Sequence, residues 1–180
     1  MNVKLEIESA KDENRIRTQT ERILEIIPAE HLRGLTKVVF VDLITEPRIS
    51  AAQRANLPAL YHPRQPGQMA WGEVAMQVVE PKKKFPQNLL ARLARKSNLA
   101  QVVLSLAAQH YYLTLSKGVK KNQLETACKL YVEKHFEKWR EKQGGLRVKL
   151  LKPFRPYLDR MARKLARRYK EELDRKSSAK

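Results

Sequence analysis

The clearest chemistry in this sequence belongs to lysine and arginine, whose positive charges bind phosphate and carboxylate groups. These residues are unevenly placed along the chain. Residues 1–80 hold 10 Lys and Arg against 11 Asp and Glu, whereas residues 81–145 hold 14 against 4 and residues 146–180 hold 13 against 4. The formal net charge of +18 therefore comes from the chain after residue 80.

A positive field concentrated in one part of a chain favours an anionic partner. We expect nucleic acid first, and an acidic protein or an anionic membrane surface would satisfy the same charge. Because the basic residues follow no base-reading pattern, we expect binding that is sensitive to salt and weakly selective for sequence. The residues expected to contact phosphates are Lys82, Lys83, Lys84, Arg92, Arg95, Lys96, Arg160, Arg163, Lys164, Arg167 and Arg168.

The last five of these residues lie on a predicted amphipathic helix from about Pro156 to Leu173. Its basic face is opposed by an apolar stripe at steps of three or four residues. That stripe consists of Phe154, Leu158, Met161, Leu165, Tyr169 and Leu173. The stripe could dock on the rest of the chain, on a partner helix or on a membrane interface.

Catalytic residue types are scattered. None of the four histidines lies at i, i+4 from another, and His110 and His135 fall on apolar helix faces, which is typical of buried core histidines. His62, in the loop-like segment YHPRQP, is open to a binding role. The sequence has no phosphate-binding loop, dinucleotide-binding fingerprint or zinc-finger spacing, so we expect neither cofactor nor metal.

The element that must organise the chain is Asn98–Leu115, a long segment with almost no charge. Its apolar residues cover most of a helix circumference, which predicts a helix packed on most sides, with Ser97 or Asn98 as its N-cap. Polar residues interrupt the segment, so a buried helix is favoured over a membrane span. Its expected core face is Leu99, Val102, Val103, Leu106, Ala107, His110 and Leu113.

The other predicted elements surround this helix. Residues 2–8, 37–44 and 71–79 have the composition or alternation of strands, with a short extended piece at 59–62 inside a Pro-rich excursion from Thr45 to Gly67. Residues 12–27, 87–96 and 123–142 read as helices. We therefore predict an α+β fold in which a small sheet packs on the buried central helix and further helices. This domain covers residues 1–145, and a basic helical extension covers 146–180.

The segments AAQHYY at Ala107–Tyr112 and KGVKKNQLETACKLYVEKHFEKW, together with the order of elements, resemble a minimal gluzincin-type metallopeptidase over roughly Asn2–Arg140. The resemblance implies a zincin-like scaffold. In that family the buried helix carries H-E-x-x-H, whose two histidines bind zinc and whose Glu is the general base, and a later helix supplies a Glu ligand.

This chain departs from the family pattern at the catalytic positions. If His110 is the second motif histidine, Leu106 and Ala107 occupy the first histidine and general-base positions; if Gln109 takes that place, Ser105 and Leu106 do. Glu125, in LETACKLY, lies two residues before Ala127 rather than three. The expectation is therefore a zincin-like relative without catalysis, and an atypical zinc hydrolase is the enzyme alternative.

The N-terminal residues MNVKLEIESAKDENR contain no apolar signal-peptide core, and the single Cys128 cannot form an internal disulfide. Both observations predict a cytoplasmic protein. The leading functional hypothesis is thus a non-catalytic, strongly basic protein that contacts nucleic-acid phosphates. The alternatives are the zinc hydrolase and a module that binds a protein or an anionic membrane.

Overall fold

The computed structural model describes residues 3–8, 12–80, 87–116 and 119–143, and for residues 87–93 and 121 it describes the backbone alone. A compact unit covers Met1–Trp139. The predicted domain boundary at residues 145 and 146 and the predicted helix at 156–173 lie outside the described residues, so both stay predictions.

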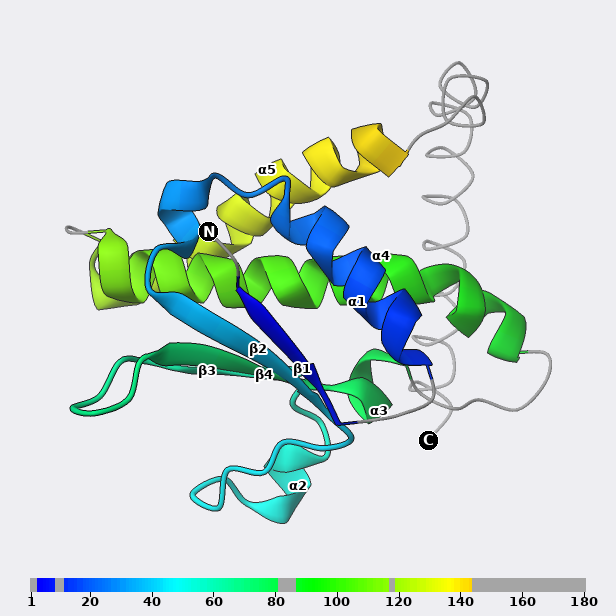
Figure 1. Ribbon diagram of the computed structural model, residues 1–180, viewed down its shortest axis with the longest axis horizontal. Helices are drawn as coiled ribbons and strands as arrows, with labels where there is room; N and C mark the ends of the chain where they lie inside the picture. The colour runs from blue at the N-terminus through cyan, green and yellow to red at the C-terminus, as the bar shows by residue number, and fades with distance from the viewer. Residues whose placement is uncertain (1–2, 9–11, 81–86, 117–118, 144–180) are drawn as a thin grey trace, which may run out of the picture. The chain divides into compact units, whose positions relative to one another are not determined.

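The protein is α+β, as its sequence predicts, and the centre of the described unit is a four-stranded mixed sheet in the order β1-β2-β4-β3 (Figure 1). Strands β1 (Lys4–Ile7) and β4 (Ala70–Ala75) run parallel to the central β2 (Leu35–Val41). Edge strand β3 (Ala59–His62) runs antiparallel to β4. Strands β1 and β3 lie where the sequence predicts them, and β2 and β4 overlap the predicted segments 37–44 and 71–79 with shifted ends.

Helices cover one face of this sheet, and the long helix α4 crosses it (Figure 1). Helix α1 packs on α4, and α4 contacts β3 and β4. None of the described helices is long and apolar enough to cross a membrane. The helical elements are α1 (Glu13–Leu24), η2 (Ala29–Leu32), α2 (Ala51–Arg54), α3 (Met76–Val79), α4 (Gln87–His110), η3 (Tyr111–Leu115), η4 (Lys121–Gln123) and α5 (Leu124–Gln143).

The predicted buried helix is confirmed in α4. Seven of its apolar residues are at most 1% exposed: Leu99, Ala100, Val103, Leu104, Leu106, Ala107 and Ala108. Leu113, which the helical repeat assigns to the same face, is instead 53% exposed. The reason is that the backbone becomes π-helical at Tyr111–Leu115, and the extra residue per turn rotates the following side chains away from the core.

Two predicted boundaries are wrong. Helix α4 continues from Gln87 through the expected break, and Asn98 does not cap it: its Nδ2 donates to the Val79 carbonyl at 3.2 Å. The predicted strand at 71–79 ends early, because the chain turns into α3 after Ala75. There the backbone N–H of Gln77 donates to the Asp42 carbonyl at 3.2 Å, which ties this turn to the end of β2.

The Pro-rich excursion is confirmed as a mostly irregular connection with β3 inside it, but it also contains the short helix α2. This helix begins with a capping box in which Ser50 and Gln53 satisfy each other's backbone N–H groups. Part of the excursion lines a pocket on the sheet face that α1 and α4 leave uncovered.

Gly72 sets how closely α4 approaches β4. A Cβ at Gly72 would lie 3.0 Å from Leu106 Cδ1 and 3.3 Å from Leu106 Cδ2, so the helix packs directly on the strand backbone. Gly72→Ala is expected to lower the free energy of unfolding by about 1–3 kcal/mol through overpacking. Urea denaturation of the purified variant measures this change.

The double variant Gly72→Ala/Leu106→Ala is the control for this mechanism. Leu106→Ala alone is expected to cost about 2–5 kcal/mol because it leaves a cavity. In the Gly72→Ala background it should cost less, because the new methyl group enters that space. Strict additivity of the two losses would contradict a direct contact between these positions.

Candidate functional site

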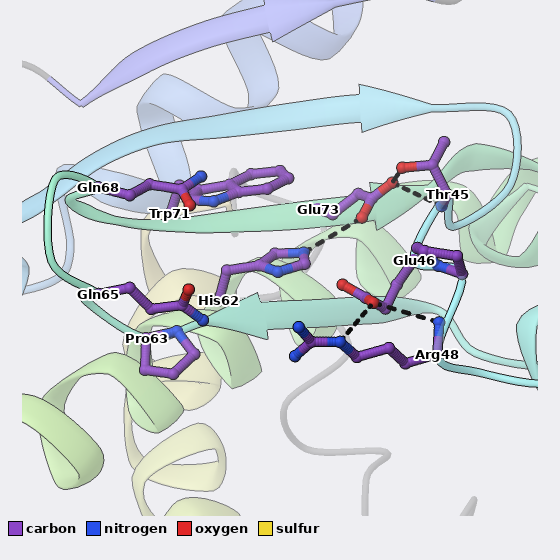
Figure 2. A pocket seen from close by; sticks show the side chains of 10 residues that line it. Thr45, Glu46, Arg48, His62, Pro63, Gln65, Gln68, Trp71 and Glu73 are labelled. Carbon is purple, nitrogen blue, oxygen red and sulfur yellow. Dashed lines mark hydrogen bonds and ion pairs between the residues drawn. The ribbon is translucent and has the colours of Figure 1, made fainter.

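A pocket of about 340 Å³ opens on the sheet face that α1 and α4 leave uncovered (Figure 2). Successive side chains of a strand point to opposite faces of its sheet. Because Tyr61 and Gly72 face α4, their neighbours His62, Trp71 and Glu73 point the other way, into the pocket. The segment after β2 supplies the opposite wall.

Glu73 lies at the base of the pocket and is only 1% exposed. Its Oε1 accepts hydrogen bonds from the backbone N–H and the hydroxyl of Thr45, both at 2.8 Å. Its Oε2 lies 3.3 Å from His62 Nε2. A buried carboxylate is costly unless donors satisfy it. Glu73 therefore holds two groups in place: the start of the segment after β2 and the ring of His62.

His62 is fixed from two sides. As a carboxylate accepts only, the bond to Glu73 requires a proton on Nε2. The imidazole also stacks on Trp71, with ring centroids 3.9 Å apart and planes inclined by 6°. Among the described residues nothing donates to His62 Nδ1, whose lone pair is thus available to a molecule in the pocket. The side chain remains 18% exposed.

The rim of the pocket carries hydrogen-bond donors. Arg48 extends from it with 87% of its side chain exposed, and its Nε lies 3.9 Å from Glu46 Oε1. Glu46 Oε1 also accepts from the Arg48 backbone N–H at 3.3 Å. Gln65 and Gln68, which pair through their backbones at 2.9 and 3.0 Å, add two side-chain amides. The pocket thus combines a hydrogen-bond acceptor of fixed orientation, His62 Nδ1, with hydrogen-bond donors at its rim.

Of the basic residues predicted to contact phosphates, the structure describes the side chains of two. Lys96 is exposed on α4, as a phosphate contact requires. Arg95 is partly compensated, because its Nε lies 3.7 Å from Glu80 Oε2. Glu80 also binds Arg15 through two hydrogen bonds of 2.8 and 3.0 Å.

The side chains of the other predicted phosphate contacts are outside the described part of the chain. Arg92 lies within α4, where only the backbone is described. The positions of Lys82, Lys83, Lys84, Arg160, Arg163, Lys164, Arg167 and Arg168 lie outside the described residues. The predicted phosphate-binding surface therefore stays a prediction.

His110 is a buried structural residue with 0% exposure. Its Nε2 lies 3.1 Å from the Arg33 carbonyl, which can only accept, so the proton is on Nε2. Its Nδ1 then accepts from the Tyr61 hydroxyl at 2.9 Å, and that hydroxyl in turn accepts from Thr114 at 2.7 Å. Burial lowers the pKa of His110. The prediction of a satisfied core histidine is confirmed.

These contacts do not fit a zinc site of the gluzincin type. Both ring nitrogens of His110 are engaged, Leu106 packs on β4, and Glu125 is exposed. Across the described ranges no three His, Cys, Asp or Glu side chains come together in a group that could hold a metal ion. Zinc binding by His110 would have to replace one of its two hydrogen bonds in the core.

A second group of rings joins α5 to the rest of the unit. His31 Nδ1 lies 2.9 Å from the Tyr131 hydroxyl, and the His31 ring lies 4.1 Å from Tyr111. His135, 3% exposed, packs 4.3 Å from Tyr131, and its Nδ1 has no hydrogen-bond partner among the described residues. Burial lowers the pKa values of His31 and His135, and nearby Lys134 and Lys138 lower that of His135 further. His135 is therefore buried, as predicted from its helix face.

These histidines make stability depend on pH. A folded-state pKa below the unfolded value means that the unfolded chain binds more protons, so stability falls as pH decreases below about 6.5. The slope is at most about 1.4 kcal/mol per pH unit for each histidine that stays neutral when folded. Urea midpoints between pH 8 and pH 5 measure it. In His135→Gln the loss below pH 6.5 should be smaller than in the wild type, and equal losses would contradict this origin.

Sequence reasoning missed the pairing of His62 with Glu73. The segment YHPRQP marked His62 as open to binding, but Glu73 looked like one polar residue in an alternating strand. The available signal was the alternation itself, which puts both residues on the sheet face away from the helix. Their proximity depends on the antiparallel register of β3 and β4, which pairs His62 with Trp71.

No family model, curated protein or solved structure matches this chain. The guide to its function is therefore the chemistry of its own residues.

Proposed function

We propose that this protein binds the phosphates of nucleic acid through its basic segments, in the cytoplasm, and that it does not perform metallopeptidase chemistry. The observation that supports the proposal is the placement of charge. Residues 1–80, which form the whole sheet, are close to electrically balanced, with 10 Lys and Arg against 11 Asp and Glu. The excess positive charge belongs to residues 81–180, which follow the last strand of the described part of the chain.

This separation of charge suits a protein in which residues 1–80 form a neutral scaffold and the later residues form the binding surface. A protein that neutralises several phosphates releases their condensed counterions, which supplies affinity without reading bases. Residues 146–180 alone contain 13 Lys and Arg against 4 Asp and Glu. Two basic residues of the chain after residue 80 lie on α4 with their side chains in the described unit. Lys96 is exposed there, and the charge of Arg95 is partly neutralised by Glu80.

The zinc hydrolase alternative is less favoured because His110 uses both ring nitrogens in the core. Metal analysis of the purified protein tests it directly. Stoichiometric zinc in the wild type that is lost in His110→Ala would revive that alternative and count against this part of the proposal.

Binding of labelled 20-nucleotide duplex DNA and single-stranded RNA, followed by fluorescence anisotropy, tests the main proposal. We expect binding at about 50 mM salt with little preference between unrelated sequences. Absence of binding to either nucleic acid at that salt would overturn the proposal.

Anionic liposomes distinguish the membrane alternative. Binding to liposomes but not to nucleic acid, lost when Leu158, Met161 and Leu165 are replaced by Ser, would indicate that the apolar stripe enters a membrane interface. Binding to neither, with capture of an acidic protein, would favour the protein-interaction alternative.

A further inference from the structure

The pocket on the open sheet face contains an arrangement that phosphate binding does not need. A carboxylate buried in the middle of a strand lowers stability unless its hydrogen bonds are complete, and Glu73 is 1% exposed. Thr45 satisfies one of its oxygens with two bonds of 2.8 Å. The other oxygen is directed at His62.

The consequence for His62 is a fixed tautomer and a fixed ring plane. The hydrogen bond to Glu73 keeps the proton on Nε2. Stacking on Trp71, with ring centroids 3.9 Å apart, fixes the plane of the imidazole. A carboxylate behind an imidazole also stabilises the imidazolium that forms when the other nitrogen takes a proton. In Figure 2 the imidazole stands inside the pocket, between Glu73 and the Glu46–Arg48 wall.

We propose that this pocket is a site where His62 acts as a general base toward water attacking a small acyl ester, with Glu73 as its positioning residue. The cavity of about 340 Å³ falls in the range of small-molecule sites. The donors at its rim, Arg48, Gln65 and Gln68, complement the negative charge that develops on a carbonyl oxygen during attack. The site goes beyond phosphate binding and does not depend on it.

The proton and the bonds in this step balance. A water O–H proton moves to His62 Nδ1 while the water oxygen forms a bond to the acyl carbon. The bond from the acyl carbon to the alcohol oxygen breaks, and its electron pair leaves with that oxygen. The proton then passes from His62 to solvent or to the leaving group. No metal, oxidant or cofactor is needed.

Hydrolysis of 4-nitrophenyl acetate by the full chain tests the proposal, with release of 4-nitrophenolate followed by absorbance. General-base catalysis typically contributes about 10²–10⁴-fold, so His62→Gln is expected to lower the second-order rate constant at least about tenfold. Glu73→Gln should also lower it, because the neutral amide stabilises an imidazolium less than the carboxylate does. His31→Gln, which removes another accessible histidine, is the matched control and should leave the rate within about twofold.

A second measurement keeps the test independent of this ester and of folding defects in the variants. Diethyl pyrocarbonate reacts with an accessible imidazole nitrogen: the nitrogen forms a bond to the carbonyl carbon, and ethyl carbonate leaves. Mass spectrometry of the wild type should find His62 modified before His31, His110 and His135. Unchanged hydrolysis in His62→Gln, or slower modification of His62 than of His110, would overturn the proposal.

Discussion

Replacing Arg163, Arg167 and Arg168 together by Gln is expected to reduce nucleic-acid binding by several hundredfold. Each phosphate contact contributes about −0.9 to the slope of log K against log salt, so three lost contacts reduce its magnitude by about 2.7. Over the one decade from about 1 M to about 0.1 M salt, a slope change of about 2.7 corresponds to a ~500-fold loss of affinity. Anisotropy titrations of a labelled 20-nucleotide duplex at several salt concentrations measure both quantities.

The matched control removes the same amount of charge from the part of the chain that is electrically balanced. Arg22, Arg33 and Arg64 are exposed residues of the described unit, and their replacement by Gln should change the slope by less than one contact. Equal effects of the two triple variants would mean that net charge alone governs binding. That result would contradict a binding surface formed by the basic segments.

The second large effect is expected at His110, where one substitution breaks a chain of hydrogen bonds. His110→Ala leaves the Tyr61 hydroxyl and the Arg33 carbonyl without their partner and opens a cavity beside α4. Unpaired buried groups cost about 1–3 kcal/mol each, and cavities add to this, so we expect a loss of roughly 3–5 kcal/mol. Thermal and urea unfolding measure the loss, and a chelator should leave the wild-type midpoint unchanged.

Tyr61→Phe provides the comparison for this network. It removes only the hydroxyl, which leaves His110 Nδ1 and Thr114 without that partner, and should cost less than His110→Ala. The double variant should lose less than the sum of the single losses, because both changes break the same bond. Additive losses would contradict the hydrogen-bonded pair.

The sequence predicts the elements of this fold better than it predicts their ends. Alternation in residues 2–8 and the apolar repeat of residues 98–110 depend on burial of whole faces, so β1 and α4 appear where they are expected. Ends depend on single contacts with distant parts of the chain. Asn98 has the side chain of a helix cap, but its amide donates a hydrogen bond to the Val79 carbonyl instead, and α4 continues through this position.

The candidate site shows the same limit. Burial of His110 and His135 follows from their helix faces, because the period of a helix is fixed. The pairing of His62 with Glu73 depends on how β3 returns along β4 after the Pro-rich excursion, and local sequence does not specify that register. Leu113 leaves the core because a π-helical turn changes the period, and its sequence carries no evident signal for that turn.

Glu80 has a consequence for the approach of a partner. Glu80 precedes, by two positions in the sequence, the segment Lys82, Lys83 and Lys84. Its carboxylate accepts hydrogen bonds from Arg15, and its Oε2 lies 3.7 Å from Arg95 Nε. The negative charge of Glu80 therefore partly neutralises the positive charge of Arg95. An anion that approaches Arg95 therefore has to compete with a carboxylate that already lies beside the guanidinium.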